Sequence, residues 1–358
     1  MTTHTTAPLR TAIVGCGGMG RKHARVLAML PDYELVAGCD LLAELAREFA
    51  AQFPGAKPYA DYGELLAVER PDVVVVATNN ATHAALTIQA AEAGVRGIYC
   101  EKPMATCMAD GWAMVETCRR HGVALAVNHQ RRTLPVFQAM RRLIAEGAIG
   151  EVELICASCA GDLLSDGIHL IDTIRHLAGD AEVRWVFGQV YRVPPDPAEP
   201  RGTGYHVSGG WRYGHPVETG ALGVFEFAGG LRAEVHTGGV QIKGRRYQDY
   251  QVFGTRGRLW RAGDAADPPL LIQTDAHPGW APAVVEPHAP GTELTWTYEQ
   301  FARMVRTAAG HPLAGDSALK SLEVVMAIYE AARQHRRIDL PLEQPRFPLE
   351  LMIEQGEL

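Results

Sequence analysis

Residues 13–20, "IVGCGGMG", decide the fold, because they join a short apolar run to a helix-period segment through closely spaced glycines. Three of these glycines have GxGxxG spacing, after a predicted strand and at the start of a predicted helix. The first permits a tight turn, the second lets backbone approach a pyrophosphate, and the third lets helix pack on strand. The helix N-terminus then receives the phosphate charge. A turn without a ligand is the alternative. The predicted dinucleotide-binding residues of this turn are Gly15, Gly17, Gly18, Met19 and Gly20.

Short β-rich runs alternate with helix-period segments from residue 10 to about residue 130. The run "VVVV" at residues 73–76 is continuously apolar, as expected of a parallel strand that is buried on both faces. Repeated βα units of this kind predict a doubly wound parallel sheet. We therefore expect an α/β chain that begins with a dinucleotide-binding Rossmann domain over residues 1–130.

The pattern changes after residue 150 to β-like runs joined by glycine-rich turns. This predicts an α+β domain over residues 131–358, with a mostly antiparallel sheet that has one open face. Such a face predicts a homodimer or homotetramer. Whether a C-terminal helix packs back on the first domain stays open. Residues 193–218 are rich in Pro and Gly, which indicates either a functional lid or a disordered excursion.

Composition excludes several classes of protein. The chain has 34 basic and 41 acidic residues, a net charge of −7, and no basic patch, so neither nucleic acid nor an anionic membrane is an expected partner. No apolar run reaches the ~18 residues of a membrane span, and the first ten residues lack a signal-like apolar segment. A cytoplasmic protein is expected. The His, Cys and acidic residues lack metal-site spacing, so no metal is predicted.

Asp40 ends the second β-rich run, twenty residues after Gly20. A carboxylate at this point can accept hydrogen bonds from both adenosine-ribose hydroxyls and would repel a 2′-phosphate. Leu41 and Leu42 follow it, so no arginine is present there to receive that phosphate. The sequence favours NAD over NADP.

Polar residues follow three predicted strands, in the stretches 77–83 ("ATNNATH"), 101–103 ("EKP") and 128–132 ("NHQRR"). Ligands of open α/β sheets bind at the carboxyl ends of the strands. Each stretch taken alone could be a solvated loop. Because all three converge on the edge that would hold a nicotinamide, together they predict a functional site.

The stretches 14–27, 77–94 and 100–105 together resemble the Gfo/Idh/MocA family of NAD(P)-dependent oxidoreductases, and the similarity covers the whole chain. The resemblance implies a Rossmann domain followed by an α/β domain whose open sheet commonly forms the oligomer interface. It implies substrates such as sugars, cyclitols and nucleotide-linked sugars. It also implies that Lys102 projects into the active site. The residues that it places around the cofactor are Thr78, Asn79, Asn80, His83 and Glu101.

The stretch "LLSDGIHLIDTIRHLAG" supplies a second set of candidates on one helix face, among them Asp166 and His169. The resemblance favours His169, since relatives carry a histidine in this helix that faces the nicotinamide. Relatives often have an aspartate four residues before it, where this chain has Ser165, so Asp166 is the less secure acid. Gln130 replaces an asparagine of the family pattern, and Gln130 and Arg131 are predicted substrate contacts.

Oxidation of a secondary alcohol removes hydride from carbon while a base takes the hydroxyl proton. Histidine titrates near neutral pH, so His169 is the predicted general acid/base, and Lys102 would orient the substrate oxygen and stabilise developing alkoxide charge. Catalytic and substrate-binding roles are thus predicted for Lys102, His169 and Asp166. Two alternatives remain: an NAD-using glycosidase with transient oxidation, and a non-catalytic NAD-linked sensor.

Overall fold

A computed structural model describes residues 7–239, 247–286 and 292–358 of the chain. It contains two compact units. The first unit is made of the described parts of Met1–Ala105, Asp110–Gln130 and Ala289–Leu319, and the second of Thr106–Ala109, Arg131–His288 and Lys320–Leu358. The domain boundary expected at residue 130 stays a prediction. No described helix is both long and apolar enough to cross a membrane.

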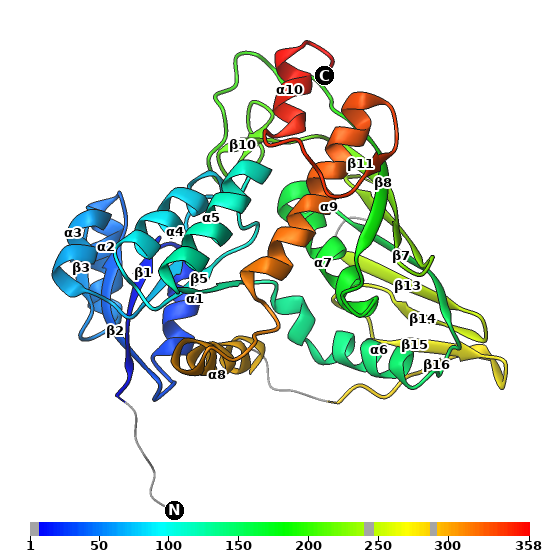
Figure 1. The fold of residues 1–358 in the computed structure, drawn as a ribbon, viewed down its shortest axis with the longest axis horizontal. Helices are drawn as coiled ribbons and strands as arrows, with labels where there is room; N and C mark the ends of the chain where they lie inside the picture. The colour runs from blue at the N-terminus through cyan, green and yellow to red at the C-terminus, as the bar shows by residue number, and fades with distance from the viewer. Residues whose placement is uncertain (1–6, 240–246, 287–291) are drawn as a thin grey trace, which may run out of the picture. The chain divides into compact units, whose positions relative to one another are not determined.

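The first unit contains a six-stranded parallel sheet in the order β3-β2-β1-β4-β5-β6 (Figure 1). The order reverses between β1 and β4, which is the doubly wound arrangement, so the predicted Rossmann sheet is confirmed. The strands are β1 (Leu9–Val14), β2 (Tyr33–Cys39), β3 (Lys57–Tyr59), β4 (Val73–Val76), β5 (Gly97–Cys100) and β6 (Ala124–Val127). The helices that follow them are α1 (Gly18–Leu27), α2 (Ala43–Gln52), α3 (Tyr62–Glu69), α4 (His83–Glu92) and α5 (Met108–His121).

One strand of this unit was not expected from the sequence, and one helix comes from a distant part of the chain. Strand β3 has three residues, of which Lys57 and Pro58 are exposed, and it lies at the edge of the sheet. Proline is tolerated in edge strands because one ladder hydrogen bond is not needed there. A strand this short and exposed shows no hydrophobic periodicity, so it gave no signal.

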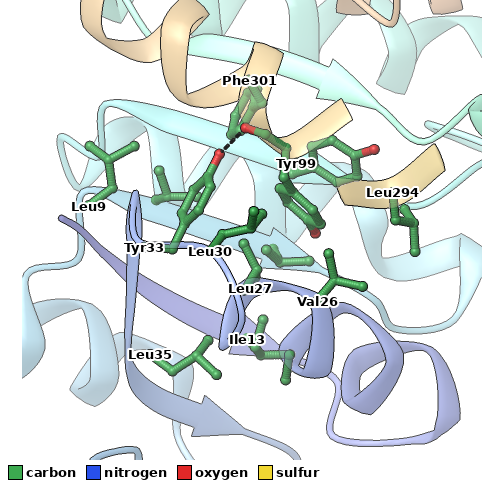
Figure 2. Packing of buried hydrophobic residues seen from close by; sticks show 14 of the residues in the cluster. Leu9, Ile13, Val26, Leu27, Leu30, Tyr33, Leu35, Tyr99, Leu294 and Phe301 are labelled. Atoms are coloured by element: carbon green, nitrogen blue, oxygen red, sulfur yellow. Dashed lines mark hydrogen bonds between the residues drawn. The ribbon is translucent and has the colours of Figure 1, made fainter. Parts of the chain in front are cut away.

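Helix α8 (Thr292–Thr307) comes from the far end of the chain but belongs to the first unit, where it contacts α1 and β6. Its residues Tyr298 and Phe301 are fully buried, and their rings lie 4.5 Å and 5.4 Å from the ring of Tyr99 in β5. Figure 2 shows Tyr99 and Phe301 in this cluster, together with Tyr33, whose hydroxyl donates to the backbone oxygen of Tyr298 at 2.6 Å. Helix α8 thus completes the core of the first unit.

The second unit contains a nine-stranded sheet in the order β16-β15-β14-β13-β7-β12-β11-β8-β17. Only the pair β7 and β12 is parallel among its described strands, so the predicted mostly antiparallel sheet is confirmed. The strands are β7 (Val152–Cys159), β8 (Val183–Tyr191), β11 (Gly220–Phe227), β12 (Arg232–Thr237), β13 (Gln248–Gly254), β14 (Gly257–Arg261), β15 (Leu271–Thr274), β16 (His277–Pro282) and β17 (Ile338–Asp339).

Helices cover one face of this sheet. The helical elements of the unit are α6 (Pro135–Ala145), the single π-helical turn η3 (Leu163–Gly167), α7 (Ile168–Leu177), α9 (Gly315–Gln334, whose first residues belong to the first unit) and α10 (Pro348–Glu354). Helix α7 packs on β7 and β12. Ile328 of α9 lies against Gly188 of β8 and Gly223 of β11, where any Cβ would come within 2.7 Å of it.

The opposite face carries partly exposed apolar side chains. Strands β8 and β11 alternate buried and exposed positions, as expected of a sheet with one covered face. On the uncovered positions, Phe187 is 43% exposed, Tyr191 57% and Leu222 37%. The rings of Trp260 and Trp280 lie 5.7 Å apart further along the sheet. Residues 193–218 form a mostly irregular loop that includes the two-stranded ladder of β9 (Trp211–Arg212) and β10 (His215–Pro216).

Candidate active site

The glycine turn connects β1 to α1. Gly15 has a φ of +92°, and a Cβ at this position would lie 2.4 Å from the carbonyl oxygen of Ala77. A Cβ at Gly20 would lie 1.8 Å from the carbonyl oxygen of Gly15. By contrast, a Cβ at Gly17 or Gly18 would have no neighbour within 4 Å. Gly15 and Gly20 therefore permit close packing, while the open space above Gly17 and Gly18 suits a pyrophosphate at the start of α1.

Two neighbours of the glycine turn were also predicted to bind cofactor. Met19 is 38% exposed beside the turn. The Asp40 carboxylate, at the carboxyl end of β2, accepts hydrogen bonds from the backbone NH groups of Cys16 (3.0 Å) and Leu42 (2.9 Å). These bonds fix its position close to the turn, and the lone pairs that remain can accept from ribose hydroxyls.

The stretch after β4 forms a short 3₁₀ turn, η1 (Asn80–Thr82), that leads into α4. Thr78 and Thr82 share a hydrogen bond between their hydroxyls at 2.7 Å. The Asn79 carbonyl accepts from the Thr82 hydroxyl, while the side chain of Asn80 is mostly buried. These contacts shape the loop at the carboxyl edge of the sheet. The predicted cofactor contacts of Thr78, Asn79 and Asn80 remain predictions.

His83 is fully buried and joins two of the predicted stretches. Its Nδ1 lies 2.8 Å from the carbonyl oxygen of Pro103, and its Nε2 lies 3.1 Å from that of Thr78. Burial lowers the pKa of His83 despite these carbonyl partners. The His83 side chain thus connects the loop after β4 to the turn after β5. Its predicted role around the cofactor would be to hold these two segments together.

The Glu-Lys-Pro triplet lies directly after β5, and Glu101 is nearly buried there. Its Oε1 accepts from Asn128 Nδ2 at 2.7 Å and lies 2.8 Å from Nε2 of His23, and its Oε2 accepts from the backbone NH of Lys102 at 3.2 Å. Burial alone would raise the pKa of Glu101, but His23, Lys102 and Asn128 outweigh it and hold the pKa at about 2. Glu101 is therefore an anion at neutral pH. Lys102 is partly exposed beside it.

In the second unit, η3 and α7 carry the other predicted catalytic residues. Asp162 caps η3 by accepting from the backbone NH of Ser165 at 2.7 Å. Asp166 lies within η3, and His169 is the second residue of α7. Both residues are buried, each with 8% of its surface exposed. The backbone oxygen of His169 accepts from the Tyr250 hydroxyl at 3.5 Å.

Asp166 is held by two groups that the sequence did not connect with it. Arg212, in the loop of residues 193–218, donates from Nη1 to Asp162 at 2.9 Å and to Asp166 at 2.5 Å. The Tyr247 hydroxyl donates to the other oxygen of Asp166. Burial alone would lower the pKa of Arg212, but the two carboxylates raise it. A buried ion pair thus holds this loop against η3, the turn directly before the helix that carries His169.

The same loop makes further contacts with η3. His215 Nε2 lies 3.1 Å from the Ser165 hydroxyl. Glu218 accepts from the backbone NH of Leu163 at 2.6 Å and from the Tyr329 hydroxyl at 2.7 Å. Burial, with the nearby charge of Asp162, raises the pKa of Glu218 to about 7. The stretch 212–218 therefore contacts η3 at several points, and a lid role for residues 193–218 stays a prediction.

Tyr247 connects Asp166 with the predicted substrate contact Arg131. The guanidinium of Arg131 lies 5.4 Å from the centre of the Tyr247 ring and forms a two-point ion pair with Asp264, at 3.1 Å and 3.0 Å. Gln130 begins the short turn η2 (Gln130–Thr133). Arg131, Tyr247, Asp166 and Arg212 thus form one continuous polar series in the second unit. Direct substrate contact by Gln130 and Arg131 stays a prediction.

Two other polar residues of α7 are occupied by structural contacts. The Asp172 carboxylate accepts two hydrogen bonds from Arg132, at 2.7 Å and 2.9 Å, and both side chains are buried. His176 Nδ1 lies 2.7 Å from Nη1 of Arg141. Burial, with the charges of Arg132 and Arg141, lowers the pKa of His176 to about 4. These residues hold the helix that presents His169.

Comparison with known proteins identifies the class. The family model described as "Oxidoreductase family, NAD-binding Rossmann fold" matches residues 9–129, and the model "GFO/IDH/MocA C-terminal domain" matches residues 157–260. The chain belongs to the Gfo/Idh/MocA family, and its first unit contains the NAD-binding Rossmann fold of that family.

Individual relatives share parts of the chain. It is 35% identical to D-apiose dehydrogenase of Paraburkholderia graminis over 196 residues, which are 50% of this chain and 52% of that protein. It is 26% identical to myo-inositol 2-dehydrogenase of Thermotoga maritima over 266 residues, which are 70% of this chain and 75% of that protein. The chain thus spans about half the length of the first of these relatives.

A solved structure supports the fold over nearly the whole chain. An oxidoreductase from Agrobacterium radiobacter, in complex with NAD⁺, L-tartaric acid and magnesium, has a TM-score of 0.76 and 21% identity. The match covers 93% of this chain and 98% of that one. At this level of identity the similarity shows the fold alone.

Proposed function

We propose that the chain is an NAD-dependent oxidoreductase that acts on a secondary hydroxyl, or the corresponding ketone, of a sugar, cyclitol or sugar derivative. Family membership supports the reaction class, and the names of two relatives, an apiose and an inositol dehydrogenase, support the substrate class. The observation that carries the proposal is the turn at Glu101, Lys102 and Pro103. It lies at the carboxyl end of β5, where sheets of this type bind their ligands, with a buried anion at its base.

The residues of the first unit fit NAD by their chemistry. The open space above Gly17 and Gly18 admits a pyrophosphate, and the fixed carboxylate of Asp40 suits an adenosine ribose without a 2′-phosphate. NAD, when bound, supplies the hydride acceptor. The remaining proposed cofactor contacts are Gly15, Met19, Gly20, Thr78, Asn79, Asn80, His83, Glu101 and Lys102.

His169 is proposed as the general acid/base, and Lys102 as the residue that orients the substrate oxygen. His169 would accept the hydroxyl proton as hydride leaves carbon. The Lys102 ammonium would donate a hydrogen bond to the same oxygen and stabilise its developing negative charge. Asp166, which accepts hydrogen bonds from Arg212 and Tyr247, is proposed as a third catalytic residue that also binds substrate. Gln130 and Arg131 are proposed as further substrate contacts.

The proposed reaction is tested by a screen of sugars and cyclitols with NAD and with NADP. The measurement is the absorbance of the reduced nicotinamide. Stoichiometric NADH formation with at least one sugar or cyclitol is expected. Cleavage of a glycoside without net NADH would instead indicate an NAD-using glycosidase with transient oxidation. NAD binding without turnover of any compound would indicate a sensor.

Substitution of the two proposed catalytic residues tests their roles. Since general acid–base catalysis contributes about 10²–10⁴-fold, His169→Ala should lower kcat by about that factor. Lys102→Met should lower kcat/KM for the sugar. Both variants should bind NAD as the unmodified protein does, measured by quenching of intrinsic fluorescence. Turnover at the unmodified rate in His169→Ala would overturn its assignment.

The open face of the second sheet supports a homo-oligomer, which we propose is a dimer or tetramer. Phe187, Tyr191 and Leu222 expose apolar surface on neighbouring strands, and such surface is commonly covered in an assembly. Light scattering coupled to gel filtration would measure the mass in solution. Replacement of Phe187 and Tyr191 by Ser should then yield a folded monomer, whereas an unchanged mass would exclude this face.

A further inference from the structure

Behind the Glu-Lys-Pro turn, a chain of buried hydrogen bonds runs from α1 to α8. His23, in α1, is fully buried, with Nε2 2.8 Å from Oε1 of Glu101 and Nδ1 2.8 Å from the hydroxyl of Tyr298 in α8. Asn128 donates to the same oxygen of Glu101 and accepts from the Tyr99 hydroxyl at 2.9 Å. Every residue named here belongs to the first unit. The carboxylate is thus held from the two sides by α1 and by the end of β6.

The two oxygens of Glu101 have different tasks. Oε1 is occupied by His23 and Asn128, and Oε2 accepts from the backbone NH of Lys102. The Glu101 side chain therefore links His23 and Asn128, in the protein core, to the backbone of Lys102. A carboxylate rotated away from His23 would also release the backbone NH of Lys102.

The tautomer of His23 follows from its two partners. A carboxylate oxygen can only accept, so Nε2 carries a proton and donates to Glu101. Burial, with the nearby tyrosines and Glu101, raises the pKa of Tyr298 well above its usual value, so Tyr298 keeps its hydroxyl proton. That hydroxyl can donate to Nδ1 of a neutral His23. The arrangement resembles the way a carboxylate and a histidine fix each other's orientation in other enzyme sites.

We propose that His23 is a positioning residue for the active site: through Glu101 it fixes the backbone of Lys102, and Tyr298 of α8 fixes His23 in turn. This inference rests on the proposed function, since it assigns His23 a part in aiming the lysine. His23 touches neither substrate nor reacting atoms in this account. Its effect reaches the site through hydrogen bonds alone, over sequence separations of 78 residues to Glu101 and 275 residues to Tyr298.

The first test compares three variants of the full chain. His23→Leu removes the donor to Glu101 at similar volume, His23→Gln keeps an NH group that can reach it, and Tyr33→Phe is the matched control. Tyr33→Phe removes a buried hydrogen bond to the backbone of Tyr298 but leaves His23 and Glu101 untouched. Because misplacement by about 1 Å can cost about 10²-fold, His23→Leu should lower kcat roughly 10–100-fold, with NAD affinity changed less than about threefold.

His23→Gln should restore most of the lost kcat, and Tyr33→Phe should keep the unmodified kcat while it lowers the melting temperature. An equal loss of kcat in folded His23→Leu and His23→Gln would overturn the inference, since the hydrogen bond would then not matter. So would unmodified turnover in His23→Leu. If His23→Leu does not fold, Tyr298→Phe replaces it, and its kcat must fall below that of Tyr33→Phe for the inference to stand.

A second readout does not depend on turnover. Without His23, burial should raise the pKa of Glu101 above the lowered value that it has in the unmodified protein, so its protonated form should persist to a higher pH. The infrared band of a protonated carboxyl should appear in His23→Leu and disappear when Glu101→Gln is added. The kcat of His23→Leu should also gain an acidic limb at a higher pH than in the unmodified protein. The other titratable groups that face Glu101 are Lys102, Tyr99, Cys100, His83 of α4 and Tyr298 of α8.

The two readouts separate the inference from the proposed function. If the unmodified protein oxidises no sugar or cyclitol, the proposed function fails, and the infrared band still reports whether His23 holds the Glu101 charge. If the unmodified protein is active but His23→Leu shows neither the band nor the acidic limb, the inference about His23 fails and the function stands.

Discussion

Glu101 in the first unit and Asp166 in the second are both buried carboxylates beside residues proposed for catalysis, and the protein holds them in different ways. Glu101 is held by His23, Asn128 and the backbone NH of Lys102, which lie in helix α1 and directly after strands β6 and β5. Asp166 is held by Arg212, from a long loop, and by Tyr247. The first arrangement is built into the core, and the second depends on an irregular segment docked onto η3.

This difference separates a carboxylate with a fixed position from one whose position depends on a loop. A carboxylate held by a packed core keeps its position whatever the ligand, which suits a site for a fixed cofactor. A carboxylate held by a loop can change its partner when the loop changes. If residues 193–218 contact the substrate, changes in this loop should alter the setting of Asp166 while Glu101 keeps its position.

The largest expected effect tests the loop-held carboxylate. Arg212→Leu leaves Asp162 and Asp166 without their cation, and an unpaired buried charge costs about 3–5 kcal/mol of the free energy of unfolding. Urea denaturation at neutral pH measures it. Arg232→Leu is the matched control, because Arg232 is 66% exposed and 3.5 Å from Glu226, so its loss should change stability by less than about 1 kcal/mol. Similar losses in both variants would show that the buried ion pair of Arg212 contributes no more to stability than an exposed one.

The next-largest effect is expected in the first unit, at the glycine turn. Gly15→Ala places a Cβ 2.4 Å from a backbone oxygen at a φ of +92°, so the turn must move. We expect a loss of about 2–3 kcal/mol in the free energy of unfolding, with weakened NAD binding. Gly18→Ala meets no atom within 4 Å and should leave stability within about 1 kcal/mol. Calorimetry and fluorescence titration measure the two quantities; a stable, NAD-binding Gly15→Ala would contradict the close packing.

A third prediction uses pH to distinguish the carboxylates of the two units. Glu218, beside the loop, has a folded-state pKa raised to about 7, so the stability that it contributes is present below pH 4.5 and lost as pH rises through 7. The loss is on the order of 3 kcal/mol. Glu218→Gln should lack this part of the pH dependence between pH 5 and 8 in urea titrations.

Glu101 should show the opposite pH dependence of stability, and it serves as the internal comparison for Glu218. Its pKa is lowered to about 2, so its contribution to stability is present above pH 4.5 and lost as pH falls toward 2. Glu101→Gln should flatten the acidic side of the stability profile while Glu218→Gln flattens the neutral side. Identical profiles for the two variants would contradict the assigned shifts.

The smallest expected effect concerns cofactor choice. Asp40→Asn should weaken NAD binding about tenfold, equal to about 1.4 kcal/mol, and narrow the preference over NADP because the repulsion of a 2′-phosphate is removed. Glu44→Gln, at an exposed position in α2, makes the same change of charge nearby and should alter neither affinity. Fluorescence titration with both cofactors measures this, and an unchanged ratio in Asp40→Asn would exclude Asp40 as the selecting residue.

Much of the first unit was predictable because its signals are local. The apolar run at Val73–Val76 and the alternation of strand and helix patterns lie within short windows of sequence. Edge elements gave less information: β3 contains Pro58, and β16 exposes nearly every residue and contains two prolines. Neither has the periodicity that burial imposes, so both were missed.

The site was predictable where the sequence places residues at strand ends, and less so where distant segments meet. Lys102 was proposed from a motif and His169 from the family resemblance, and their roles stay predictions. The contacts of Tyr247 and Arg212 depend on segments that only the fold brings to Asp166. His23 lies three residues after Gly20, on the buried side of α1, but its partner Tyr298 is 275 residues away. A spacing rule could have marked His23, while no local rule finds Tyr298.

The place of α8 in the first unit has a consequence for synthesis of the chain. Residues up to Gln130 leave the ribosome well before Ala289–Leu319, which supply Tyr298 and Phe301 to the same core. At about 5–20 residues per second, synthesis from residue 131 to the end of this segment, 189 residues (319 − 130), takes roughly 10–40 s. During that time the nascent Rossmann sheet carries an uncovered aromatic surface, so chaperone capture should be strongest on ribosome-bound chains that end before α8.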